Sequence, residues 1–109
     1  MRLLGMILED ESRLEDVLSA FAEVGVVDAV VLEAEGMEKV LSHLPIFAPL
    51  SAMVRGTRQK RYLILGITDN DDALKEAEVL LSDYGINLRE SGGGVLFTIP
   101  VDGAVFLDE

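Results

Sequence analysis

The residues best suited to binding chemistry are cationic and close together in the sequence. Four of the nine Lys and Arg residues fall within seven positions: Arg55, Arg58, Lys60 and Arg61. Guanidinium and ammonium groups bind phosphate and carboxylate, and this cluster stands in an acidic chain of net charge −11. We therefore expect the three arginines to bind an anionic effector. The alternative is that they face water and balance neighbouring acids such as Glu33, Glu35 and Glu38.

A glycine-rich turn is the second candidate for binding chemistry. It consists of Ser91 and the three glycines that follow, and an apolar stretch comes directly after it. Successive backbone N–H groups in such a turn can form a concave site for one anionic group. We therefore assign Gly92, Gly93 and Gly94 to the predicted effector site, together with the arginines.

The remaining composition excludes several kinds of chemistry. The chain has no cysteine and a single histidine, His43, which excludes thiolate catalysis and metal sites built from Cys or His clusters. Because no second histidine and no serine motif accompany His43, we expect no catalytic activity and no metal site. The acidic balance and the absence of tryptophan disfavour nucleic-acid binding, which needs a basic face and stacking side chains.

Length and hydropathy favour one folded domain. The 109 residues are half hydrophobic, which is enough material for a core, so we expect a single domain over residues 1–109. The apolar run at residues 3–8 is too short for a signal peptide or a membrane span, and three acidic residues follow it. We therefore expect a cytoplasmic protein without direct membrane insertion.

The elements that must position these residues occur in two similar copies. In the first copy a strand is predicted over residues 2–8, and Ser12 with Glu15 forms a capping box for a helix. Apolar residues recur at helical spacing in that helix: Leu14, Val17, Leu18 and Phe21. Gly25 ends the helix, and a second strand is predicted over residues 28–34.

The same order returns sixty residues later. A strand is predicted over residues 62–68, Asp71 or Asp72 caps the next helix, Gly85 ends it, and the last strand covers residues 95–101. The predicted buried stripe of this helix consists of Leu74, Ala77, Leu80, Leu81 and Tyr84. The pattern indicates an internal duplication, although generic patterning of helices and strands is the alternative.

Two strand-helix-strand halves predict an α+β, ferredoxin-like βαββαβ fold, with a four-stranded antiparallel sheet and both helices on one face. The strands carry apolar residues at consecutive positions, as in Val30-Val31-Leu32 and Leu63-Ile64-Leu65. Such strands place apolar groups on both faces of a sheet. We therefore expect the protein to self-associate through the face that the helices leave open.

Residues 36–60 form an insert between the two halves that is too long for a hairpin turn and too apolar for a passive linker. Its apolar residues at helical spacing predict one or two short helical turns with an adhesive face. The residues that we expect to contact a partner protein are Met37, Leu41, Phe47, Leu50 and Met53. The alternative is that this face packs on its own subunit or on a neighbouring copy.

Taken together, these residues resemble the PII nitrogen-regulatory signalling proteins. The resemblance covers nearly the whole chain in order. It rests on Gly25-Val26, the segment Glu33-Ala-Glu-Gly36-Met37, the long loop, the strand over residues 62–68, and Gly92-Gly-Gly94-Val-Leu-Phe97-Thr-Ile-Pro100-Val101. The glycine turn leading into the fourth strand is its most specific part.

The resemblance implies a homotrimer with ligand clefts between subunits, and a loop after the second strand, here residues 37–60, that docks on a transporter or an enzyme. Family members bind ATP or ADP, and often 2-oxoglutarate, and they regulate rather than catalyse. The nucleotide-binding pattern is incompletely matched. Val95 stands where the family has a phosphate-binding lysine, Val30 stands where it has a threonine, and no basic residue follows Arg89. An adenine nucleotide is therefore possible, and the effector is left open.

The sequence thus predicts a divergent PII-like regulator that binds a small effector between subunits and controls a partner through residues 37–60. Two alternatives remain. One is a trimeric scaffold whose ligand site has degenerated. The other is a ferredoxin-like enzyme for small molecules that uses His43 or the arginine cluster.

Overall fold

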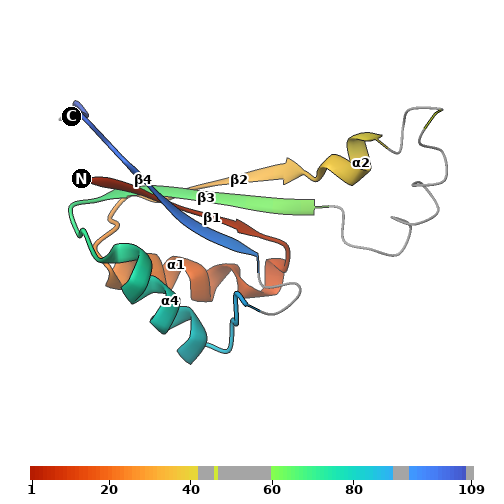
Figure 1. Ribbon diagram of the computed structural model, residues 1–109, viewed down its shortest axis with the longest axis horizontal. Helices are drawn as coiled ribbons and strands as arrows, with labels where there is room; N and C mark the ends of the chain where they lie inside the picture. The colour runs from red at the N-terminus through yellow and green to blue at the C-terminus, as the bar shows by residue number, and fades with distance from the viewer. Residues whose placement is uncertain (42–45, 47–59, 90–93, 108–109) are drawn as a thin grey trace.

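The computed structural model describes residues 1–41, 46, 60–89 and 94–107. Figure 1 shows one sheet with helices below it. The strands at residues 30–35 and 60–68 form a hairpin that extends beyond the helices. The elements in chain order are β1 (Arg2–Leu8), a 3-10 turn (Glu11–Arg13), α1 (Leu14–Glu23), β2 (Val30–Glu35), α2 (Met37–Leu41), β3 (Lys60–Thr68), α4 (Ala73–Asp83) and β4 (Val95–Pro100). The strand order is β2-β3-β1-β4, with every pairing antiparallel. This α+β arrangement is compatible with the predicted ferredoxin-like fold.

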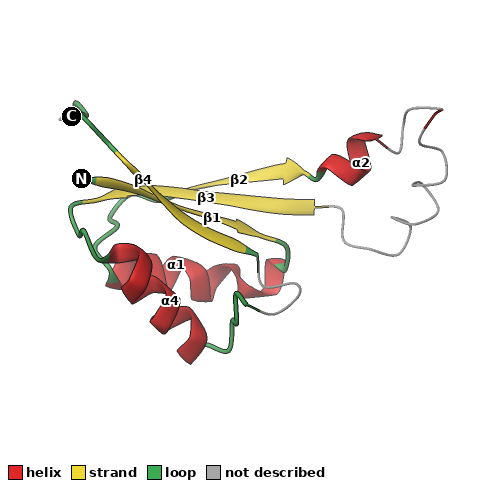
Figure 2. Ribbon diagram, in the orientation of Figure 1, coloured by secondary structure: helices red, strands yellow, loops and turns green. Residues whose placement is uncertain are grey.

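Both α1 and α4 lie on the same face of the sheet (Figure 2), as the sequence predicts. The core lies between these helices and the two central strands. Its largest fully buried side chains come from all four elements: Phe21, Leu4, Met6, Leu8, Ile64, Leu81 and Val17. The helices bury the apolar face that their 3.6-residue period produces, and burial alternates along β3 although apolar residues occupy consecutive positions there.

The two helices end in the same way, which supports the duplication. Gly25 and Gly85 adopt positive φ angles of 98° and 87°. In each case the glycine and the residue after it donate backbone hydrogen bonds to carbonyls of the last helical turn. The residue after each glycine, Val26 or Ile86, is buried in the core. The glycines thus turn the chain and anchor it at equivalent places.

The beginning of the first helical segment differs from the prediction. Asp10, rather than Ser12, is the capping residue, because its Oδ1 accepts hydrogen bonds from the backbone N–H (3.0 Å) and the hydroxyl (2.7 Å) of Ser12. A 3-10 turn intervenes, and α1 begins only at Leu14. Glu15 therefore lies too early in α1 to complete a capping box with Ser12, and that prediction was wrong.

The beginning of α4 also departs from the prediction. Asp72 occupies the N-cap position but makes no capping hydrogen bond through its side chain. Asn70 organises this turn instead, since its side chain accepts from the N–H of Asp72 (3.0 Å) and donates to the carbonyl of Val24 (3.1 Å). Leu74 is exposed and Ala73 takes the buried place, so the predicted stripe was wrong at Leu74.

The observed strand bounds differ slightly from those predicted. β2 begins at Val30, two residues later than expected, because the connection before it packs across β3 rather than pairing with it. A Cβ atom on Gly66 would lie 2.2 Å from Val26 Cγ1, so only a glycine allows this crossing. β3 begins two residues earlier than predicted, at Lys60, and β4 ends at Pro100.

Candidate functional site

The face of the sheet opposite the helices is apolar from edge to edge. Strand register assigns it these positions: Leu3, Gly5 and Ile7 of β1; Val30, Leu32 and Ala34 of β2; Leu63, Leu65 and Ile67 of β3; Val95, Phe97 and Ile99 of β4. We call these twelve residues the bare face. The same register adds one charged side chain, Arg61, at the end nearest the hairpin. The predicted second apolar face is therefore confirmed.

Apart from Phe106 of the C-terminal segment at one end, the bare face lacks a cover among the described residues. Figure 2 shows no described helix on this side of the sheet. Val95, Val30 and Ile99 are 49 to 55% exposed, whereas Leu4 and Met6 on the opposite face are fully buried. An apolar surface of this extent is typical of a contact with another macromolecule.

One part of the bare face is already packed. The ring of Phe97 lies directly over Gly5, where an added Cβ would come within 2.3 Å of the ring atoms. Gly5 therefore allows an aromatic side chain from β4 to lie flat across β1. The ring of Phe97 therefore occupies the space above Gly5 on the bare face.

The end of the sheet nearest the hairpin is charged. Arg61 lies 3.2 Å from Glu9, and Lys60 lies 3.2 Å from Glu33. The hydrogen bond and the charge of Glu33 raise the pKa of Lys60 above its ordinary value of 10.5. Burial, followed by a hydrogen bond to Glu11, raises the pKa of Tyr62 above 10.0. These acids therefore hold both described cations of the basic cluster in ion pairs within the subunit.

The described members of the predicted effector site lie at the same end of β1. Gly94 has a φ angle of 97°, and a Cβ there would lie 2.2 Å from the carbonyl oxygen of Ile7. It thus allows β4 to approach β1, while Arg61 pairs with Glu9 just beyond the end of β1. The other predicted members, Arg55, Arg58, Gly92 and Gly93, lie outside the described residues.

The described members of this donor set do not by themselves fit a triphosphate. Such a ligand needs several cations or free N–H groups, and both described cations already pair with carboxylates. Val95, which follows the turn, is apolar and half-exposed. Phosphate binding would therefore first have to break the Glu9–Arg61 or Glu33–Lys60 pair.

The predicted partner segment begins as a short helix beyond the end of the hairpin. Figure 1 shows α2 on the far side of β2, away from α1 and α4. Met37 is 70% exposed and Val40 is exposed beside it, whereas Leu41 is half-buried. The expected helical turn is confirmed for α2. The remaining predicted contacts, Phe47, Leu50 and Met53, lie outside the described residues, as does His43.

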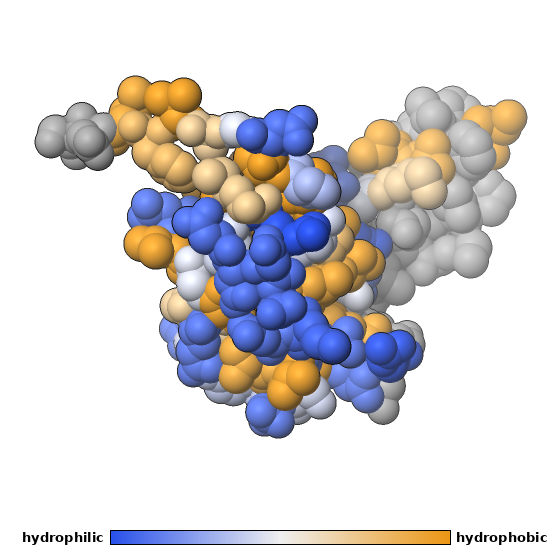
Figure 3. All heavy atoms as spheres, turned by 60° about the vertical axis from the view of Figure 1, so that its left-hand side comes forward, coloured by the Kyte–Doolittle hydropathy of each residue, from blue (hydrophilic) through white to orange (hydrophobic). Residues whose placement is uncertain are grey.

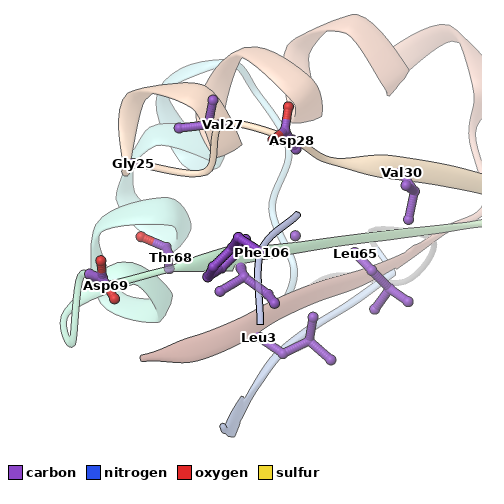
Figure 4. Close-up of a pocket in the computed structure, with 11 residues that line it drawn as sticks. Leu3, Gly25, Val27, Asp28, Val30, Leu65, Thr68, Asp69 and Phe106 are labelled. Atoms are coloured by element: carbon purple, nitrogen blue, oxygen red, sulfur yellow. The ribbon is translucent and has the colours of Figure 1, made fainter. Parts of the chain in front are cut away.

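A cavity at the opposite end of the sheet was not predicted from the sequence. Its volume is about 540 Å³, and its walls come from β1, the connection between α1 and β2, the end of β3, and the C-terminal segment. Figure 4 shows Phe106 of that segment beside Leu3, Leu65 and Thr68. The available signal was the apolar run Val105-Phe106-Leu107, which follows the last strand and has no strand partner.

Other kinds of site find no support in the described part of the chain. There, no group of three or more His, Cys, Asp or Glu side chains could hold a metal ion. No described helix is long and apolar enough to cross a bilayer. Comparison of the chain with protein-family models finds no match, and neither does comparison with curated proteins.

Proposed function

We propose that this chain is the subunit of a homotrimeric, PII-like regulator that binds a small effector in clefts between subunits and controls a partner protein through residues 37–60. The observation that carries the proposal is the bare face, twelve positions without a charged side chain. The partner would be a transporter or an enzyme. The proposal uses a ferredoxin-like fold whose open face is closed by copies of the same chain.

The energetics of the bare face support assembly. Covering a half-exposed Ile, Val or Leu contributes on the order of 1 kcal/mol. Each subunit offers five such side chains that are more than a third exposed: Ile7, Val30, Leu32, Val95 and Ile99. Packing between sheets also needs a smooth surface, which Phe97 provides by lying over Gly5.

The position of the charged end supports transmission to residues 37–60. Glu9 and Arg61 form an ion pair directly beside the hairpin from which α2 extends. An anionic effector that attracts Arg61 would compete with Glu9 for it. The competition would break the Glu9–Arg61 ion pair at the base of residues 37–60. The exposed side chains of α2 would then contact a partner differently.

Sedimentation of the purified chain tests the assembly. We expect one species of about three times the 11.8 kDa of the chain at micromolar concentration. A monomer at that concentration would contradict the proposal.

Thermal unfolding with added ligands tests effector binding. ATP, ADP, AMP, cyclic dinucleotides and 2-oxoglutarate form the test panel, and we expect one of them to raise the Tm in a saturable way. Replacing Arg55, Arg58 or Arg61 with Ala should weaken that response. Arg89→Ala is the matched control, because Arg89 pairs with Glu78 on α4, away from the hairpin. A trimer that responds to no ligand would favour the scaffold alternative.

A further inference from the structure

The cavity at the end of the sheet away from the hairpin is built by the sheet edge and by the C-terminal segment. β2 pairs with β3 only as far as Val30 and Leu65, while β1 continues alongside β3 to Thr68. The end of β3 is therefore open on the β2 side, and the connection after α1 passes above it. The C-terminal segment closes another side with Phe106.

The walls of this cavity are mainly apolar. Leu3, Val30, Ile67 and Phe106 line it with aliphatic and aromatic groups. The hydroxyl of Thr68 is already engaged, since it donates to the carbonyl of Val24 (3.3 Å) and accepts from the N–H of Asn70 (3.1 Å). The cavity therefore favours a ligand with a hydrophobic body.

Among the described residues, the only charged side chains that line the cavity are two carboxylates, Asp28 and Asp69. Neither has a hydrogen bond or an ion pair with another described residue, unlike Glu9 and Glu33 at the other end of the sheet. No described lysine or arginine lines the cavity. An anionic ligand would therefore meet only repulsion from the charged groups, and a cation would meet two unpaired partners.

We propose that this cavity binds a small organic cation, an amine whose hydrophobic body lies against Leu3, Ile67 and Phe106 and whose ammonium group pairs with one of the two carboxylates, Asp28 or Asp69. A bare metal ion is a poorer occupant, because most of the wall offers no oxygen ligand. The site is distinct from the predicted effector site, which lies at the hairpin end. Four of its lining residues, Leu3, Val30, Leu65 and Ile67, belong to the bare face, so the cavity lies at one end of the surface that the proposed trimer would bury.

The exposed C-terminal segment fits a role as one wall of such a site. Val105, Phe106 and Leu107 are 67 to 89% exposed. Figure 3 shows this end of the molecule with hydrophobic atoms along the protruding segment and hydrophilic atoms on the neighbouring body. A hydrophobic amine would cover part of this apolar surface, and its ammonium group would pair with a carboxylate that has no partner among the described residues.

Three probes of similar shape and different charge test the proposal by titration calorimetry near pH 7. They are tryptamine, its neutral alcohol analogue tryptophol, and the anion indole-3-acetate. We expect saturable binding of tryptamine that is at least about tenfold tighter than that of indole-3-acetate, with tryptophol between them. Equal or tighter binding of the anion would overturn the proposal. So would the lack of saturable binding by tryptamine, phenethylamine and cyclohexylamine alike.

Variants locate the binding within the cavity. Asp28→Asn and Asp69→Asn keep the shape of the side chain, and the variant that removes the pairing carboxylate should weaken tryptamine binding about three- to fivefold while leaving tryptophol binding unchanged. Asp71→Asn is the matched control, because Asp71 lies in the same turn but points to Arg2 at 4.0 Å and does not line the cavity. Tryptamine affinity that is unchanged in both test variants would refute the assignment.

Sedimentation of the same samples separates this proposal from the one before it. Charge-selective binding by a chain that sediments as a monomer would support the cavity and contradict the trimer. A trimer that binds tryptamine no better than indole-3-acetate would support the trimer and contradict the proposed cavity ligand.

The Phe106→Ala variant tests the orientation of the ligand. It should weaken the binding of tryptamine and of tryptophol equally, since the ring contacts the body of both. Weaker binding of tryptamine alone would contradict the assigned orientation.

Discussion

Both faces of the sheet carry large apolar side chains, but their surroundings are very different. Met6 and Ile7 are neighbours in β1, yet Met6 is fully buried beneath the helices and Ile7 is 37% exposed on the bare face. Each subunit completes its helical face by itself, from residues of its own two helices. The bare face has no such partner among the described residues. Apolar sequence therefore identifies two surfaces that require burial, and only one of them is buried within the chain.

The comparison separates stability from assembly. Interactions on the helical face determine whether one subunit folds, since Phe21, Leu81 and Ile64 are all inaccessible to water. In the proposed trimer, interactions on the bare face would determine how subunits meet. Substitutions on the two faces should therefore differ in whether their effect depends on protein concentration.

The largest effect is expected from a charge placed on the bare face. Ile99→Lys should convert the proposed trimer to monomers at micromolar concentration, because a buried unpaired ammonium group costs several kcal/mol. Ile99 is 49% exposed in the subunit, so the fold tolerates a lysine there. Val79→Lys is the control, since Val79 is similarly exposed on α4. Loss of assembly in both variants, or in neither, would contradict the role of the bare face.

The pair Met6 and Ile7 tests the comparison within one strand. Met6→Ala should lower the free energy of unfolding by about 2–5 kcal/mol at every protein concentration, because it leaves a cavity in the core of a single subunit. Ile7→Ala should lower the free energy of unfolding by less. This loss should grow when the protein is concentrated enough to assemble. Urea unfolding over a hundredfold range of concentration measures both. If the loss of unfolding free energy in Met6→Ala depended on protein concentration, the helical face would also take part in assembly. The proposed difference between the two faces would then be wrong.

Gly5 probes how firmly the bare face is packed before assembly. Gly5→Ala should cost about 1–3 kcal/mol, because its methyl group would overlap the ring of Phe97. In a Phe97→Ala background the same substitution should cost little, which a double-mutant cycle detects as a coupling energy. An equal cost in both backgrounds would mean that the ring does not rest on Gly5.

Features with a local cause were predictable from the sequence. The burial of Phe21 and Val17 follows from helical periodicity, and the helix ends at Gly25 and Gly85 follow from the freedom of glycine to adopt positive φ angles. The apolar character of both sheet faces is likewise encoded by consecutive apolar residues in each strand. These predictions needed only neighbours within one turn or one strand.

Features that depend on distant partners were not predictable. Asn70 organises the start of α4 by bonding to Val24, forty-six positions away, so the sequence identified Asp72 as the N-cap residue but not the side chain that makes the hydrogen bonds of this turn. The ion pair of Arg61 with Glu9 joins the beginning of β3 to the residue after β1. The cavity likewise depends on the C-terminal segment returning beside the first strand. Arg61 and Gly94, the two described members of the predicted effector site, lie at one end of the sheet because of the strand register. The periodicity of apolar residues does not specify this register.

The smallest effect is expected from pH, and it belongs to the helical side of the comparison. Burial raises the pKa of Tyr84 above its ordinary value of 10.0, with a further contribution from Glu23, and burial does the same for Tyr62. The folded state thus favours the neutral phenol. The resulting stability is fully present below pH 10.0, the unfolded value, and is lost as the pH rises through the raised folded values.

Ultraviolet titration of tyrosinate measures this directly, because Tyr62 and Tyr84 are the only tyrosines and there is no tryptophan. We expect both to ionise later in the folded protein than in urea. The Ile99→Lys variant should give the same tyrosinate titration curve as the unchanged protein. Register places Tyr62 on the helical face and Tyr84 follows α4, so neither lies on the bare face. A curve that moves toward the unfolded one when assembly is lost would mean that neighbouring subunits bury these phenols. The helical face would then no longer be completed within one subunit.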